Sequence, residues 1–361
     1  MKITPISFRI PNLNEVSDIN ELVELAKENF ARLRTKNQFR KLGKGYLVYQ
    51  VIAQNHSFQG VVCGVLIEEF ANRTIVHHEK TIPYKELQQA EFAEKQWGFC
   101  KPLLMTHRPI PSVGKIIDRY LDREPLISAH IERYNTTHRV WQIENPEEEE
   151  AITKAYSQID HTFILDGHHR AAAIDILDER GLGIHHGMCA FFDIDNLEIL
   201  PFHRILQIDP GLTIDKLIGG LEQLGQVTKN PDTFFPNKEH CIHFYLHGEL
   251  IAFFWSSEIL ENSEAVMRLD VNLVNEYIFH QLLNINSVRK SQKIQYIEGN
   301  ATPDKIKSEL SVGPEKMAIL LHSIDIEDLI DITSNNRLLP PKSTWFLPRL
   351  ANGIVTMTFG D

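Results

Sequence analysis

Two β-rich runs joined by a short polar turn constrain the fold of this chain more than any other feature. Residues 45–52 and 59–67 are rich in valine, isoleucine and tyrosine, and the turn around Asn55-His56-Ser57 separates them, which is typical of a β-hairpin. A short strand at Ile3 to Phe8 precedes them, followed by an amphipathic helix that begins after Asn14. A hairpin and a helix with one apolar face predict an α+β fold in which helices cover a sheet.

The alternation of strands and helices changes near Asp209-Pro210-Gly211, which is typical of a domain boundary. We expect residues 1–208 to form one domain and residues 209–361 a second α+β unit. The second unit is predicted to contain helices at 213–224 and 271–283, and hairpin strands between residues 240 and 255. A proline-rich segment at 339–348 and a closing strand at 353–359 are expected to dock back on the body.

The composition is that of an ordinary globular protein with a formal net charge of −11. It has no run of eighteen apolar residues and no signal peptide, so we expect a cytoplasmic protein without a membrane partner. The acidic charge argues against nucleic acid as a partner. Four cysteines without Cys-x-x-Cys spacing are expected to be buried thiols: Cys63, Cys100, Cys189 and Cys241.

A turn directly between an apolar strand and a helix is the most informative stretch of the chain. The N–H groups of a first helical turn lack partners and favour an anion, and Gly167 lets the backbone approach a ligand. Arg170 offers a forked donor for phosphate oxygens, and His168 and His169 add hydrogen bonds. Asp166 is a candidate to hold a divalent cation or accept a proton. The alternative is that Asp166 only caps the helix and Arg170 pairs with a surface acid.

A second polar cluster, His77-His78-Glu79-Lys80-Thr81, lies before a helix predicted from Tyr84 to about Gln96. Glu79 is a candidate general base or metal ligand, and Thr81 a candidate phosphate contact. In the alternative interpretation Thr81 caps the helix and the histidines lie on the surface.

Three further cationic segments are candidates to add positive charge to an anion pocket: His138-Arg139, His203-Arg204 and Lys342-Ser343-Thr344. The first two pairs are equally compatible with side chains that snorkel over apolar surface, and the third with a docked terminal segment. Structural zinc is not expected, because adjacent histidines rarely ligate one ion with good geometry. The adjacent histidines are at positions 77–78, 168–169 and 185–186.

An acidic run is predicted to begin a helix rather than bind a metal. Asn145 has the residue type of an N-cap, and Pro146 suits the first helical position. The glutamates at 147–150 then lie at the positive end of the helix dipole.

Five segments in order resemble the domain of unknown function 1015 family across nearly the whole chain. They are His78-Glu79-Lys80-Thr81, His138-Arg139-Val140-Trp141, Leu165-Asp166-Gly167-His168-His169-Arg170, Leu200-Pro201-Phe202-His203-Arg204 and Pro341-Lys342-Ser343-Thr344-Trp345-Phe346-Leu347-Pro348. That family looks related to free serine kinases of the ParB and sulfiredoxin superfamily, in which an Asp-Gly-His-Thr-Arg turn binds nucleotide phosphates. The resemblance implies a mixed sheet with flanking helices in the first domain.

The resemblance also implies roles for individual residues. Asp166 would assist transfer to a serine-like hydroxyl and bind magnesium, and Glu79 is the expected base. His169 stands where the kinase motif has threonine. The expected nucleotide- and phosphate-binding residues are Gly167, His168, His169, Arg170, Thr81, His78, Arg139, His203, Arg204, Lys342, Ser343 and Thr344.

The leading hypothesis is a magnesium-dependent phosphotransferase that uses ATP or ADP to phosphorylate free serine or a similar small hydroxyl compound. One alternative is a noncatalytic nucleotide-binding regulator. Another is a phosphate-ester hydrolase, and a homodimer is an open alternative for the oligomeric state.

Overall fold

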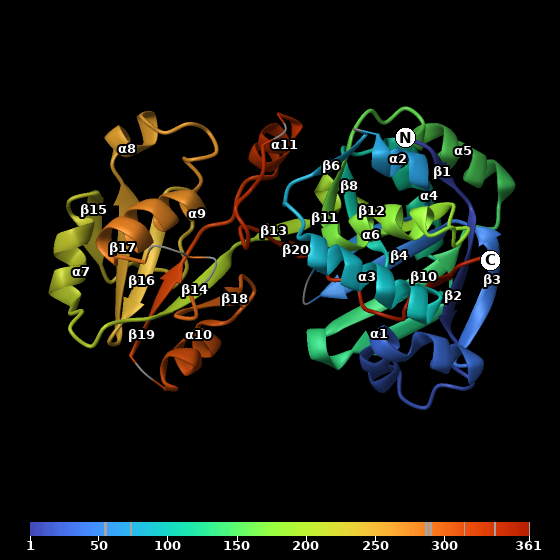
Figure 1. The fold of residues 1–361 in the computed structure, drawn as a ribbon, viewed down its shortest axis with the longest axis horizontal. Helices are drawn as coiled ribbons and strands as arrows, with labels where there is room; N and C mark the ends of the chain where they lie inside the picture. Colours follow the sequence, from blue (N-terminus) through green and yellow to red (C-terminus); the bar gives the residue numbers. More distant parts are fainter. Residues whose placement is uncertain are drawn as a thin grey trace. The chain divides into compact units, whose positions relative to one another are not determined.

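The chain folds into two compact units, which Figure 1 shows with most of their helices and strands labelled. A computed structural model describes residues 1–53, 56–72, 74–285, 288, 291–313, 315–335 and 337–360. Asn55 of the predicted turn and Arg73 lie outside these residues. The first unit comprises Met1–Glu198 and Pro348–Asp361, and the second comprises Ile199–Leu347.

The first unit is built on a sheet with the strand order β6-β11-β8-β12-β5-β4-β10-β9, and β1 also pairs with β5. β11 is parallel to β6 and β12 is parallel to β8, whereas the other pairs are antiparallel, so the sheet is mixed. The predicted hairpin is confirmed as β4 and β5. The strands are β1 (Ile3–Thr4), β4 (Leu47–Ala53), β5 (His56–Leu66), β6 (Ile75–His77), β8 (Leu103–His107), β9 (Ile127–Ile131), β10 (Thr136–Gln142), β11 (Thr162–Asp166) and β12 (His186–Asp193).

Helices flank this sheet, and the side-chain caps of α1 and α5 follow from the local sequence. Asp18 caps α1 by accepting hydrogen bonds from the N–H groups of Asn20 and Glu21. Asn145 caps α5 as predicted, accepting from the N–H of Glu147 at 2.9 Å. α3 and α6 pack against each other. The helices are α1 (Ile19–Thr35), α2 (Ile67–Ala71), α3 (Pro83–Gln96), α4 (Pro111–Leu121), α5 (Pro146–Tyr156) and α6 (His168–Glu179), with 3₁₀ turns at Glu132–Tyr134 and Ile194–Asn196.

The C-terminal segment returns to the first unit, which confirms the predicted docking. β21 (Met357–Thr358) pairs with β7 (Gly98–Phe99), and the Gly353 N–H donates to the Cys100 carbonyl at 2.7 Å. β21 is shorter than the strand expected at 353–359. A separate pair, β2 (Ile6–Pro11) and β3 (Phe39–Gly45), lies beside this segment, because Arg9 bridges to Thr356.

The second unit has an antiparallel sheet with the strand order β15-β17-β16-β19-β14-β18 and its own apolar core. β14 belongs to this sheet, so the division falls after Glu198 and not after residue 208. The strands are β13 (Glu198–Leu200), β14 (Phe202–Gln207), β15 (Gly225–Lys229), β16 (Cys241–Leu246), β17 (Glu249–Trp255), β18 (Ile294–Glu298), β19 (Lys316–Leu320) and β20 (Trp345–Leu347). The helices are α7 (Ile214–Leu221), α8 (Ser257–Glu261), α9 (Asp270–Leu273) continued by a π-helix at Val274–Leu282, α10 (Pro303–Leu310) and α11 (Ile326–Ser334).

Across the described ranges, none of the helices combines the length and the apolar character that crossing a bilayer requires.

Candidate functional site

The parallel pairing of β6 and β11 brings two of the predicted polar segments together. Ile164 in β11 lies opposite His77 in β6. Because parallel strands end at the same edge of a sheet, the residues after β6 and the start of α6 leave the sheet side by side. The His78 imidazole spans the two segments, since its Nδ1 donates to the Ile164 carbonyl at 2.8 Å.

The turn between β11 and α6 consists of one glycine. Gly167 has φ +106°, a conformation that side chains strongly disfavour, and α6 begins directly at His168. His168, His169 and Arg170 therefore form the first helical turn, where a longer turn was expected. In the part of the chain that the structure describes, no side chain caps α6, so the proposed cap by Asp166 is absent. Uncapped N–H groups at a helix N-terminus favour an anion.

Asp166 is surrounded by three cations. Its carboxylate oxygens lie 3.0 Å from Lys101 Nζ, 3.1 Å from Arg170 Nη2 and 3.7 Å from Arg349 Nη1. The four side chains are between 16% and 29% exposed, so water screens their charges only in part. One carboxylate against three cations leaves local positive charge in a chain that is acidic as a whole.

These charges set the protonation of Asp166 and Lys101. Burial alone would raise the pKa of Asp166, but Lys101, Arg170 and Arg349 together outweigh it and hold this pKa well below its usual range. Burial lowers the pKa of Lys101 to about 8, although Asp166 opposes that shift. A carboxylate with so low a pKa is a weak base, and its three cations repel Mg²⁺. The expected roles of Asp166 as proton acceptor and magnesium ligand therefore do not fit this environment.

The Arg170 guanidinium donates hydrogen bonds to protein groups from both of its terminal nitrogens. Its Nη1 donates to the carbonyls of Lys101 and Pro102, each at 2.8 Å, and Nη2 donates to Asp166. It therefore fixes the segment before β8 against the start of α6. Arg170 pairs with a carboxylate, as in the alternative interpretation, but the partner is Asp166 itself.

Burial lowers the pKa of both histidines at the start of α6. His168 is 7% exposed, and its ring centroid lies 4.3 Å from that of His78. Burial lowers the pKa of His78 to about 4 and the pKa of His168 well below its ordinary value. Both are uncharged at pH 7. His169 lies closer to the surface, and burial also lowers its pKa.

A cavity of about 330 Å³ lies between the segment after β6 and the flank of α6. Glu79 and Thr81 both line it, so the structure brings these two predicted residues to one pocket beside α6. The side chain of Thr81 does not cap α3, whose N-cap is Ile82. The other lining residues are Phe70, His77, Lys80, Ala171, Ala172 and Asp175.

Arg139 lies on the opposite face of β10 from its neighbour His138. Successive strand residues point to opposite faces, and His138 is fully buried, with Nδ1 2.9 Å from the Tyr49 hydroxyl and Nε2 2.8 Å from the Thr136 hydroxyl. The inward residue of this pair is therefore His138, whereas the phosphate contact was expected from Arg139. That expected contact stays a prediction.

The remaining predicted phosphate ligands belong to the second unit. Arg204 is 1% exposed and donates from Nη2 to the Lys342 carbonyl at 3.2 Å, and Ser343 Oγ donates to the Pro340 carbonyl at 2.6 Å. The first bond holds Lys342 against β14 and the second closes residues 340–343 on themselves, which agrees with a docked terminal segment. A shared role of His203, Arg204, Lys342, Ser343 and Thr344 with α6 stays a prediction.

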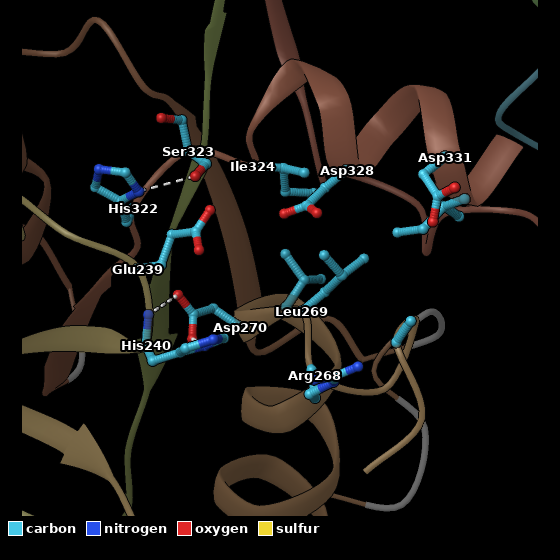
Figure 2. A pocket seen from close by; sticks show the side chains of 13 residues that line it. Glu239, His240, Arg268, Leu269, Asp270, His322, Ser323, Ile324, Asp328 and Asp331 are labelled. Atoms are coloured by element: carbon cyan, nitrogen blue, oxygen red, sulfur yellow. Dashed lines mark hydrogen bonds and ion pairs between the residues drawn. The ribbon is translucent and has the colours of Figure 1, made fainter. Parts of the chain in front are cut away.

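A second cavity, of about 270 Å³, lies within the second unit (Figure 2). Its polar lining is mainly acidic, and the Asp270 carboxylate accepts from the His240 N–H at 3.1 Å. The negative charge of these carboxylates makes the cavity a poor binding site for phosphate. Its ionisable lining residues are Glu239, His240, Arg268, Asp270, His322, Asp328 and Asp331.

Lys101 and Arg349 are the functional candidates that sequence patterns missed. Lys101 lies two residues before the first residue of β8, and Arg349 follows the last proline of the fifth motif. The signal present in the sequence was a cation just before an apolar strand or just after a motif, but it takes the fold to show that both side chains reach Asp166.

The family model described as "Protein of unknown function (DUF1015)" matches residues 6–272. The chain belongs to this family. The match includes four of the five motifs quoted above, and the fifth, at 341–348, follows the matched range. No curated protein matches this DUF1015 chain.

Several solved structures resemble this DUF1015 member at low identity. A free serine kinase variant in complex with ADP has a TM-score of 0.41 and 12% identity, with 85% of this chain and 94% of that chain covered. SbnI with a C-terminal truncation, from Staphylococcus aureus, has a TM-score of 0.43 and 10% identity, with 81% and 85% covered. A conserved hypothetical protein from Pyrococcus furiosus has a TM-score of 0.39 and 13% identity, with 85% and 98% covered.

Proposed function

We propose that the start of α6, together with Lys101, Arg170 and Arg349, binds the phosphate groups of a nucleotide, ATP or ADP. The observation that carries this proposal is the excess of positive charge around Asp166 beside an uncapped helix N-terminus. Helix N–H groups and partly buried cations are the groups that proteins use to hold phosphate oxygens. Gly167 supports the same proposal, because it occupies the N-cap position without a side chain of its own that could bond the helix N–H groups.

We further propose that the bound nucleotide donates its terminal phosphoryl group to a small hydroxyl compound, with free serine as the first candidate. The P–O bond to the nucleotide breaks, a P–O bond to the acceptor oxygen forms, and the hydroxyl proton passes to a base. Glu79 is the candidate base, because it lines the cavity beside α6. Asp166 is a weak base, because the neighbouring cations hold its pKa well below its usual range. The choice of serine comes from the sequence resemblance alone. Magnesium would accompany the nucleotide phosphates, as it usually does with few protein ligands.

A noncatalytic nucleotide-binding regulator is the second candidate. One observation favours it: the carboxylate beside the proposed phosphate seat has a pKa well below its usual range and is held by protein cations. Such a site binds phosphate without a reactive group at that position.

Phosphate binding is tested at Lys101, whose charge changes near pH 8. Nucleotides bind the protonated ammonium, so the affinity for MgATP or MgADP measured by calorimetry should weaken as the pH rises from 7 to 9. Lys101→Arg should retain binding and lose this pH dependence, because a guanidinium stays charged. Lys101→Met should weaken binding about 10- to 100-fold at pH 7, the usual range for loss of a charged hydrogen bond. Unchanged nucleotide affinity in Lys101→Met would exclude this phosphate-binding site.

Transfer is tested with ATP or ADP, magnesium and a panel of hydroxy amino acids, with phosphoserine and free phosphate measured separately. A kinase forms the phosphorylated amino acid, and a hydrolase releases phosphate without an acceptor. Glu79→Gln should abolish transfer but leave nucleotide affinity within about twofold, whereas Glu91→Gln on the exposed face of α3 should change neither. Tight binding without either product would identify the regulator.

A further inference from the structure

Two histidines and a glutamate from distant parts of the chain meet at the edge of the first unit's sheet. His78 and Glu79 follow β6, and His168 is the first residue of α6. Each offers one ligand atom, and these three atoms all lie within 4.8 Å of one another. A single metal ion bonded to all three at about 2.0–2.2 Å needs ligand atoms no more than about 4.4 Å apart, so at most a small side-chain movement brings these three atoms onto one ion.

His168 supplies an independent sign that this position binds a ligand. His168 is only 7% exposed, and its Nε2 is buried without a hydrogen-bond partner among the described residues. Buried polar atoms are normally paired, and an unpaired one calls for a partner that the protein itself does not supply. A metal ion bound to this nitrogen would supply the missing partner.

The hydrogen bond of His78 suits metal ligation. A carbonyl oxygen only accepts, so the bond from Nδ1 to Ile164 places the ring proton on Nδ1 and the lone pair on Nε2. Histidines that bind metals commonly donate their other ring N–H to a carbonyl or carboxylate, which fixes both the tautomer and the ring orientation.

We propose that His78, Glu79 and His168 bind one first-row transition-metal ion, with Zn²⁺ as the ion to test. Two imidazole nitrogens and one carboxylate oxygen suit Zn²⁺, whereas Mg²⁺ prefers oxygen ligands. Three protein ligands leave a coordination position for water or a substrate oxygen. Glu79 also lines the cavity beside α6, so a small ligand in that cavity lies next to the ion.

Local spacing did not reveal this cluster, because His78 and His168 are brought together only by the parallel pairing of β6 with β11. The inference does not rest on the proposed nucleotide binding. It gives Glu79 a second role: a carboxylate bound to Zn²⁺ does not accept a proton, so Zn²⁺ should inhibit the proposed transfer.

The test is a titration of the full chain with Zn²⁺ after treatment with a chelator, in the absence of nucleotide. Calorimetry should show one Zn²⁺ ion bound tightly per chain. Co²⁺ in place of Zn²⁺ should give the d–d absorption bands that are typical of a low coordination number. Glu79→Gln and His168→Gln should each weaken binding at least about tenfold, the lower end of the losses known for groups that support a metal site. The matched controls are Glu91→Gln and His161→Gln, both exposed, which should bind Zn²⁺ as the native protein does.

The accessible position of Glu79 keeps the test informative if His168→Gln does not fold. Native-like Zn²⁺ affinity in Glu79→Gln, together with unchanged Co²⁺ bands, would refute the site. Equal loss in the His161→Gln control would also refute it, because the ion would then lie elsewhere. Failure of this titration leaves the Lys101 nucleotide test unaffected, since that measurement uses a different group.

Discussion

At Asp166, one partly buried carboxylate faces three cations that come from three separate segments. Lys101 precedes β8, Arg170 lies in α6 and Arg349 lies in the C-terminal segment. Charges of the same sign brought this close repel one another unless a counter-charge lies between them. Asp166 supplies that counter-charge, and a bound phosphate would neutralise the excess that remains.

Replacing Asp166 by asparagine should therefore destabilise the protein by about 2–4 kcal/mol at pH 7, because three partly buried cations lose their counter-charge. The depressed pKa also fixes a pH dependence. The stabilisation by the carboxylate is full above about pH 4 and is lost as the pH falls toward the folded-state pKa. Urea unfolding of the native protein and Asp166→Asn, at pH 7 and at pH 3, measures both effects.

The matched control for that prediction is Asp178→Asn, an exposed aspartate on the same helix, which should change stability by less than about 0.5 kcal/mol. The cluster does not stabilise the fold if Asp166→Asn behaves like this control. In that case water screens the three cations, and their attraction for a phosphate group is weaker.

At the scale of elements, β11 passes into α6 through one residue. The tight connection brings the Asp166 carboxylate and the first N–H groups of α6 to the same place. Only glycine fits, because a Cβ at residue 167 would lie 2.7 Å from both Arg170 Nη2 and Leu103 Cδ2, in addition to the unfavourable φ of +106°.

Gly167→Ala should cost about 2–4 kcal/mol, the sum of left-handed backbone strain and overlap with Arg170 and Leu103. Gly181→Ala is the matched control, since Gly181 follows the same helix with φ +69° and a Cβ there would meet nothing within 4 Å. The control should cost only about 1 kcal/mol. Equal losses in thermal or urea unfolding would show that the contacts at Gly167 are irrelevant and only its backbone matters.

At the scale of the whole molecule, the C-terminal segment packs into the first unit, which is otherwise formed by the N-terminal part of the chain. The C-terminal segment contributes Arg349 to the Asp166 cluster and pairs β21 with β7. It also buries apolar side chains in this unit, each less than 10% exposed: Leu350, Ala351, Ile354, Val355, Met357 and Phe359.

Deleting residues 348–361 should therefore destabilise the first unit and not the second. Each large buried apolar side chain contributes about 1.5–3 kcal/mol to the free energy of unfolding. Hydrogen exchange measures the two units separately. Protection should fall in β2, β7 and the start of α6, while β16 and β17 of the second unit, which have their own core, stay protected. Full protection of the first unit in the truncated chain would contradict this account of the C-terminal segment.

The sequence by itself determined the local features of this protein. Residue preferences predicted the β4–β5 hairpin, the Asn145 cap of α5 and the strand before α6, because each depends on neighbours within a few residues. Five ordered motifs also identified the family, although not the chemistry of each residue.

Only the tertiary structure decided which charges and ligands meet. The salt bridges of Lys101 and Arg349 to Asp166, and the meeting of His78 with His168, join segments far apart in the chain. The placement of β14 in the second sheet likewise depends on strand pairing that no local pattern encodes. The physical reason is that electrostatic and metal-binding interactions act through space over a few ångströms, and the fold alone sets those distances.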